Sequence, residues 1–168
     1  MREIHESPHA QLIRLACEVY AREFLPDYEI VFIDDGDGDR VRNEYSAALK
    51  RARLSITLGD AMPDVLLWSP TQNSLWVIEA VTSDGEVDEM KRNMMEAFAI
   101  RNGKRRVNFT TAYLTWKETA ARQGAHRNLA VNSYVWIAED PGRALLVTSS
   151  EPPRSLETVP LLRRSPPE

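Results

Sequence analysis

The sequence has very little cysteine and no long apolar run. Its one cysteine, Cys17, has no second thiol in the chain to pair with, and such sparse use is typical of a reducing compartment. No apolar stretch reaches the roughly 20 residues that a membrane-spanning helix needs. The first residues also lack the apolar segment of a signal peptide. These absences predict a cytoplasmic protein that does not contact a membrane.

An excess of positive charge is also absent. The formal net charge is -4 over 168 residues, which argues against a protein that coats nucleic acid through its overall charge. A local basic face on an acidic protein is still compatible with DNA binding. The length predicts one domain with its own core, residues 1–148, followed by a loosely attached, proline-rich tail at 149–168.

Two extended segments joined by a short turn form the centre of the predicted fold. Residues 62–68 and 74–83 are rich in β-branched and aromatic side chains, and Pro70 and Asn73 mark the turn. Because side chains alternate along a strand, each segment carries one carboxylate, Asp64 or Glu79, in an otherwise apolar row. A buried ionised carboxylate is unfavourable without a partner. The pattern therefore predicts a compensating positive group, and a divalent metal ion satisfies this need.

Several sequence blocks occur in the order found in one family of nucleases. They are Met-Pro-Asp-Val at 62–65, Ile-Glu-Ala-Val-Thr-Ser at 78–83, the pair Lys91 and Arg92, and the blocks at 109–113 and 135–141. Over roughly residues 30–145 this pattern resembles the catalytic region of the BsuBI/PstI restriction endonucleases, within the PD-(D/E)XK nuclease superfamily. Several ordered blocks are a more specific signal than one short motif.

The resemblance implies a fold and a reaction. The expected fold is α/β, a restriction-endonuclease-like core in which helices flank a central mixed β-sheet, with elements in the order αβββαβ. The expected activity is metal-dependent hydrolysis of phosphodiester bonds in DNA, within a restriction or phage-defence system. Mg²⁺ is the expected cofactor, and Mn²⁺ is expected to substitute. The expected metal ligands are the carboxylates of Asp64 and Glu79 and the backbone carbonyl of Ala80.

The lysine of the usual motif is replaced in this sequence. It normally stands two residues after the glutamate, where this chain has Val81. A helix predicted over residues 86–101 places Lys91 on its apolar face, from which the ammonium group reaches the space beside Glu79. The alternative is a lysine whose stem packs on apolar side chains while its amine reaches water. We predict Asp64, Glu79 and Lys91 as the catalytic residues.

The first helix offers one more carboxylate. Ser7 and Pro8 form a helix start, and an amphipathic pattern follows over residues 7–25. A helical wheel places Glu23 in the apolar arc, between Leu12 and Ala16. The resemblance implies that an acidic residue of the first helix joins the metal site, so we predict Glu23 as an outer ligand. The alternative is a glutamate at the helix end that reaches water.

Two further patterns resemble metal sites only in part. His5 to His9 match the HExxH pattern, but that zinc motif requires both histidines on one face of a continuous helix. Because Ser7 and Pro8 start the helix between them, no zinc site is expected. Residues 34–39 are rich in aspartate, yet they lack the glycine and glutamate of a calcium loop. The resemblance instead implies a turn that brings Asp34 near the active-site end of the sheet.

Basic side chains gather in three places. A helix predicted at 43–54 carries the first group, the helix at 86–101 the second, and the residues after that helix the third. Strands at 29–33, 107–114 and 134–138 and a short helix at 117–123 complete the predicted elements. We expect the basic groups to contact the DNA backbone, with a solvated surface as the alternative. They are Lys50, Arg51, Arg53, Arg92, Lys104, Arg105 and Arg106.

Two functions fit this sequence. The first is a Mg²⁺-dependent endodeoxyribonuclease related to type II restriction enzymes. The second is a catalytically inactive nuclease-fold module that binds DNA or a protein partner, which the missing lysine at position 81 and the acidic net charge support. Because the chain is shorter than the endonucleases of the family, we expect a homodimer or a separate targeting subunit to help in recognising DNA.

Overall fold

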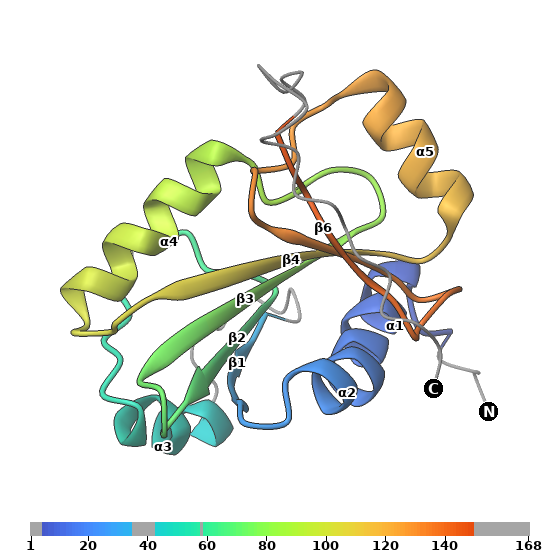
Figure 1. Cartoon of the computed structure of the whole chain (residues 1–168). Coiled ribbons are helices and arrows are strands. Elements are labelled where there is room, and N and C mark those ends of the chain that lie inside the picture. Colours follow the sequence, from blue (N-terminus) through green and yellow to red (C-terminus); the bar gives the residue numbers. More distant parts are fainter. Residues whose placement is uncertain (1–4, 35–42, 58, 150–168) are drawn as a thin grey trace, which may run out of the picture.

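A six-stranded mixed sheet forms the centre of the fold. The computed structural model describes residues 5–34, 43–57 and 59–149, and within them the strands lie in sequence order from β1 to β6 (Figure 1). Neighbours pair antiparallel from β1 to β3, parallel from β3 to β5, and antiparallel again between β5 and β6. The strands are β1 (Glu29–Ile33), β2 (Val65–Ser69), β3 (Ser74–Val81), β4 (Val107–Tyr113), β5 (Tyr134–Ile137) and β6 (Ala144–Leu146).

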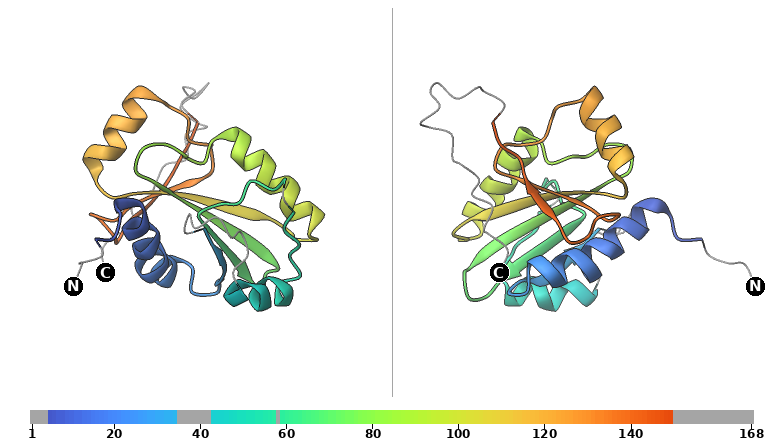
Figure 2. Two further views of the ribbon diagram at one scale, coloured as in Figure 1. Left: turned by 180° about the vertical axis from the view of Figure 1, so that it is seen from behind. Right: turned by 45° about the vertical axis from the view of Figure 1, so that its right-hand side comes forward.

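Helices cover both faces of this sheet. A continuous helix made of α1 (Pro8–Leu15), the π-helical segment η1 (Ala16–Ala21) and α2 (Arg22–Phe24) lies along one face (Figures 1 and 2). The helices α3 (Asn43–Arg51) and α4 (Glu89–Arg101) pack on the other face, and α5 (Trp116–Ala125) contacts β4. The predicted α/β fold, a central mixed sheet flanked by helices, is confirmed.

The residues of β3 divide between the two layers of the core. Leu75 and Val77 pack with α3 and α4, whereas Ile78 and Ala80 pack with the helix α1–α2. This division follows from the alternation of side chains along a strand. Both cores are closed by apolar side chains that are fully buried, so β3 is covered on both sides. Glu79 therefore lies in a buried strand rather than at a wet edge.

The central hairpin forms as predicted, and its two strands differ in length. Antiparallel pairing runs from Ser69 opposite Ser74 to Val65 opposite Ile78. Asn73 has a positive φ of 49° in the turn, a conformation that asparagine tolerates better than most residues. Since β3 continues to Val81, its last three residues extend beyond the start of β2 at Val65. The carboxylates predicted from sequence lie at this end of the hairpin.

Most predicted elements are confirmed, with differences at their ends. The helix predicted from residue 86 begins at Glu89, where the side chain of Asp88 accepts a hydrogen bond from Lys91 N as the N-cap. Strand β6 was not predicted. None of the helices in residues 5–34, 43–57 and 59–149 combines the length and apolarity needed to cross a membrane. The aspartate-rich segment from 35 and the proline-rich tail from 150 lie outside the described residues.

Candidate active site

Asp64 stands immediately before β2, and its side chain contacts the end of β3. Its Oδ2 accepts a hydrogen bond of 2.8 Å from the Ala80 backbone N–H, and its own backbone carbonyl accepts one of 2.9 Å from Asp34 N. Because the N–H and C=O of one strand residue point to the same side, the Ala80 carbonyl also faces the side of Asp64. The Asp64 side chain is 18% exposed. It is therefore fixed in position yet open to a ligand.

Glu79 is the buried carboxylate of the pair. Its Oε1 lies 3.1 Å from Nζ of Lys91, and the Glu79 side chain is only 6% exposed. Burial, and then the neighbouring Asp64 carboxylate, raise the pKa of Glu79 to about 8, although the Lys91 ammonium opposes the shift. At neutral pH the Glu79 carboxyl group therefore holds its proton unless a cation replaces it.

Lys91 comes from the first turn of α4, which begins above the end of β3. Its Nζ also lies 3.4 Å from the carbonyl of Gly85, a residue with φ of 99° in the loop before the helix. Val81, at the usual position of the lysine, is 1% exposed and packs with Tyr113. A lysine at position 81 would be buried in that cluster, so the site receives its ammonium group from the helix instead.

His9 is a site neighbour that sequence reasoning did not identify. Its Nε2 lies 3.4 Å from Oδ2 of Asp64, and the His9 side chain is 44% exposed. The helix start is as predicted, since the Ser7 hydroxyl accepts a hydrogen bond from Ala10 N and Pro8 follows it. This start directs the second residue of α1 toward the start of β2. The two residues are 55 positions apart in sequence, and no short motif connects them.

The residues at this site fit a hard divalent cation. The buried Oε1 of Glu79 accepts no hydrogen bond of normal geometry within the described part of the chain, although Lys91 lies nearby. No cluster of three or more His, Cys, Asp or Glu side chains placed to hold a metal occurs among residues 5–34, 43–57 and 59–149. A set of two carboxylates with one carbonyl suits Mg²⁺, which keeps several waters and uses substrate phosphates as ligands.

The placement predicted for Glu23 is wrong. Its side chain is exposed at the end of α2 and lines a surface hollow with Pro141 and Gly142. The cause is η1, because a π-helical segment inserts a residue into the helical repeat and rotates everything after it relative to an ideal wheel. Val19, which an ideal wheel also places on the apolar side near Leu12, is 36% exposed for the same reason. Glu23 therefore does not join Asp64 and Glu79.

The first and third basic groups lie at the far end of the sheet. Arg51 pairs with Glu29, which stands opposite Trp68 near the β2–β3 turn. Lys104 places its Nζ 5.4 Å from the centre of the Trp68 ring. Glu79 pairs with Thr111, so it lies about 13 Å along the sheet from the start of β4. The structure does not bring these basic groups to the carboxylates.

Arg92 is engaged within the fold. Its guanidinium donates to the Val131 carbonyl at 2.5 Å and pairs with Glu89 at 2.7 Å, and the side chain is 27% exposed. The bond to Val131 anchors α4 to the segment before β5. These contacts leave Lys91 as the cation of this pair that faces the carboxylates.

A buried ion pair beside the site was also missed from sequence. Glu86 is 3% exposed, and the Arg122 guanidinium donates to its two oxygens at 2.7 and 2.9 Å. Burial is the largest influence and raises the pKa of Glu86, but the hydrogen bonds and charge of Arg122, together with further hydrogen bonds, outweigh it, so the pKa is lowered. Val87 N also donates to Thr111 Oγ1 at 3.1 Å. Together these contacts fix the loop that leads from β3 to Lys91.

Comparison with known proteins connects this arrangement to restriction enzymes. The chain is 27% identical over 146 residues to the type II restriction enzyme BsuBI of Bacillus subtilis, a match that covers 86% of this chain and 45% of that enzyme. Its fold is similar to that of the SdaI restriction endonuclease, with a TM-score of 0.68 and 22% identity, over 89% of this chain and 46% of the other. The chain thus spans about half the length of these relatives.

The match to the family extends over nearly the whole described chain. The family described as BsuBI/PstI restriction endonuclease domain matches residues 1–150. This range includes the hairpin with Asp64 and Glu79, the helix with Lys91, and the sheet that supports them. The resemblance inferred from the sequence blocks is confirmed, and the chain belongs to the BsuBI/PstI restriction endonuclease domain family.

Proposed function

We propose that this chain is a Mg²⁺-dependent endonuclease that hydrolyses phosphodiester bonds of DNA, within a restriction or phage-defence system. The observation that carries the proposal is the meeting of Asp64, Glu79 and Lys91 at the end of β3. A buried carboxylate with a raised pKa beside a second carboxylate and an ammonium group lowers the stability of the fold, so stability does not explain why these residues are placed together. Such an arrangement is typical of a site that binds a cation and an anionic substrate.

The residues that would hold the metal are the two carboxylates and the Ala80 carbonyl. When bound, Mg²⁺ or Mn²⁺ lowers the pKa of water and neutralises charge that develops on the phosphate during hydrolysis. Asp64 is held in a fixed orientation by the Ala80 N–H, so little ordering is needed on binding. Because a metal ligand must be ionised, the raised pKa of Glu79 predicts that affinity for the metal would rise with pH toward about 8.

Lys91 and His9 act on either side of the carboxylates. The Lys91 ammonium, 26% exposed, is placed to contact a phosphate oxygen or to orient the attacking water. His9, at 3.4 Å from Asp64 Oδ2, holds that carboxylate toward the end of β3. DNA is the proposed partner. Cutting both strands then requires a homodimer or two successive reactions, and a separate targeting subunit would help in recognising the DNA.

The proposal is tested by cleavage of supercoiled and linear DNA with Mg²⁺ or Mn²⁺. We expect Asp64→Asn and Glu79→Gln to reduce metal-dependent cleavage by at least about 100-fold, because each removes a charge from the cation site. Lys91→Ala is expected to reduce the rate similarly while metal binding persists. Glu23→Gln is the matched control, since it makes the same chemical change at an exposed carboxylate.

Folding and metal binding are measured on the same samples. Circular dichroism establishes that each variant is folded, and calorimetry with Mn²⁺ measures binding to the site. Cleavage that survives in the two carboxylate variants would contradict the proposed site. If the wild-type protein binds DNA but does not cleave it, and adding metal changes neither binding nor cleavage, the protein is the inactive binding module.

A further inference from the structure

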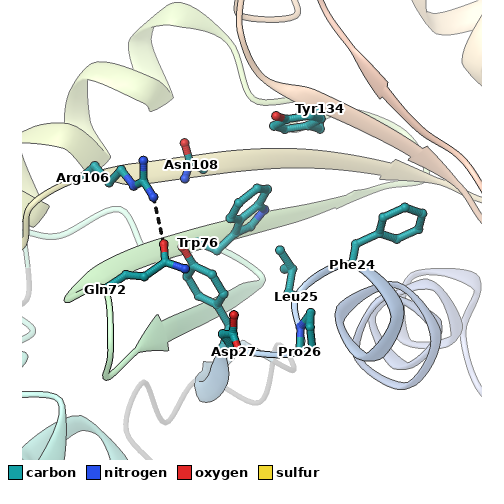
Figure 3. Close-up of a pocket in the computed structure, with 10 residues that line it drawn as sticks. Phe24, Leu25, Pro26, Asp27, Gln72, Trp76, Arg106, Asn108 and Tyr134 are labelled. Atoms are coloured by element: carbon teal, nitrogen blue, oxygen red, sulfur yellow. Dashed lines mark hydrogen bonds between the residues drawn. The ribbon is translucent and has the colours of Figure 1, made fainter. Parts of the chain in front are cut away.

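A cavity with aromatic walls lies at the end of the sheet opposite the carboxylates. It has a volume of about 350 Å³ and opens between the end of α2, the β2–β3 turn and the starts of β4 and β5 (Figure 3). Trp76 and Asn108 stand opposite each other on β3 and β4, and Tyr134 follows on β5. These three residues share the face of the sheet that α2 covers, the face opposite Glu79.

Three aromatic rings are held in fixed positions around the cavity. The rings of Trp76 and Tyr134 are 5.6 Å apart between centroids with an interplanar angle of 32°, and Tyr28 meets Trp76 edge-on at 5.6 Å. The Trp76 indole N–H donates to Thr110 Oγ1 at 2.9 Å, and the Tyr28 hydroxyl lies 2.7 Å from Ser74 Oγ. All three rings are only half-buried, so part of their apolar surface is left for a planar ligand.

Polar groups of several kinds surround this aromatic surface. Arg106 donates to Gln72 Oε1 at 2.8 Å at the rim, and Asn108 lies beside them (Figure 3). Asp27 lines the opposite side of the opening. Amide and carboxylate groups match the donors and acceptors on the edges of nucleobases, and a guanidinium binds phosphate. This combination suits a nucleotide better than a purely apolar ligand.

Basic side chains are exposed at this end of the sheet. Arg105 and Arg106 are exposed just before β4, and Lys50, Arg51 and Arg53 are exposed at the end of α3, which packs on the other face of the sheet. Although Arg51 pairs with Glu29, the group as a whole attracts a phosphate chain. Of these residues Arg106 lines the cavity itself, and the others lie at the same end of the sheet, away from the carboxylates. Aromatic platforms within a basic surface are typical of sites for single-stranded nucleic acid.

We infer that this cavity binds the base of an unpaired nucleotide, with the ring stacked on Trp76 and Tyr134 and the phosphate near Arg106. The ligand is either a free nucleotide or a base of a single-stranded segment. The site is separate from the carboxylates, because Trp76 lies about 10 Å along β3 from Glu79 and faces the other layer. The inference goes beyond the proposed cleavage and does not require it.

The test uses the four tryptophans of the chain. Protein labelled with ¹⁵N at the indole nitrogens gives one N–H signal for each, and Trp76→Phe assigns one signal to Trp76. The Asp64→Asn protein is titrated in chelator with the four deoxynucleoside monophosphates, a short single-stranded oligonucleotide, its abasic analogue and inorganic phosphate. We expect the nucleotides or the oligonucleotide to shift the Trp76 signal saturably, while the abasic analogue and phosphate leave it unchanged.

Variants of the cavity test the contacts with the base and with the phosphate separately. Tyr134→Leu is expected to weaken binding about tenfold by removing a stacking partner. Arg106→Gln is expected to weaken it by a similar factor and to reduce its dependence on salt. Trp116→Phe and Arg143→Gln are matched controls, exposed and away from the cavity, and should leave affinity unchanged.

The outcomes separate this inference from the proposed nuclease. A shift with the oligonucleotide alone identifies a strand as the source of the base, and a shift with monophosphates identifies a free nucleotide. No shift of the Trp76 signal with any nucleotide or oligonucleotide at 10 mM or below, a range in which even weak sites bind, overturns the inference. An equal shift with phosphate or the abasic strand does the same. Since no sample cleaves DNA, none of these results bears on catalysis.

Discussion

Glu79 shows how a single residue links the stability of the fold to its proposed chemistry. Its carboxyl group is buried beside Asp64 and Lys91, and burial is the largest cause of its raised pKa. The unfolded chain ionises this group near 4.5, whereas the folded chain holds the proton to about 8. Ionisation therefore favours the unfolded state between these values, and the folded protein loses stability as the pH rises through them.

We predict that Glu79→Gln stabilises the metal-free protein at high pH. Glutamine resembles the protonated carboxyl group and does not ionise, so the variant avoids the loss that the wild type suffers. The free energy of unfolding, measured with urea in chelator, should differ little between the two proteins at pH 5. At pH 8 the variant should be more stable by about 2–4 kcal/mol.

Two comparisons test whether the effect comes from the ionisation of Glu79. Adding Mg²⁺ at pH 8 should raise the stability of the wild type and not that of Glu79→Gln, because only the former binds the cation tightly. For Glu23→Gln, at an exposed position, the free energy of unfolding should depend on pH in the same way as that of the wild type. A difference between wild type and Glu79→Gln that is constant from pH 5 to 8 would contradict the raised pKa.

The contact between His9 and Asp64 leads to a second prediction at this scale. His9→Ala should increase the Mg²⁺ concentration needed for half-maximal cleavage by about tenfold, because a partner that orients a metal ligand is lost. His9→Gln retains a side-chain N–H of similar reach and should recover part of the affinity. His126→Ala, at an exposed histidine after α5, is the control. If all three variants match the wild type, His9 does not position Asp64.

At the scale of elements, the loop from β3 to α4 determines where Lys91 stands. Glu86 is fixed in this loop by Arg122 of α5, and Tyr113 and Gln123 continue the hydrogen-bonded network. The sequence around Glu86 resembles the start of a helix. Nothing in it indicates that Glu86 has an ion-pair partner 36 residues later. Its burial was for this reason not predictable from periodicity.

We predict that Arg122→Met destabilises the protein by about 3 kcal/mol, because it leaves the buried Glu86 carboxylate without its cation. Urea unfolding at pH 7 measures the change. Arg143→Met removes an exposed pair with Asp140 and should cost less than about 0.5 kcal/mol. Equal effects of the two substitutions would show that the Glu86 network is no more important than a surface pair.

The helix α1–α2 and strand β6 show where sequence patterns fail for physical reasons. The apolar stripe correctly predicts the helix, yet the wheel misplaces Glu23 because it assumes an unbroken α-helical repeat through η1. Strand β6 has three residues, two of them exposed, so it lacks the alternation that marks longer strands. Its partner β5 is buried and was predicted.

At the scale of the whole molecule, the sequence predicted the parts of the candidate site better than their arrangement. Asp64, Glu79 and Lys91 stand in recognisable blocks, and their meeting needs only one hairpin and the next helix. The placement of the basic groups depends instead on how β4 aligns with β3 and how α3 returns to β1, which are long-range contacts. No local pattern encodes these distances, so the sequence could not place either group relative to the carboxylates.

The two-sided character of β3 restricts how the length of this protein can vary during evolution. Trp76 and Glu79 lie on opposite faces of one strand, three residues apart. Inserting or deleting a single residue between them would turn one of the two side chains to the wrong face. Changes in length are therefore expected to be tolerated in the 70–73 turn and to be eliminated by selection within β3, even where the new residue is apolar.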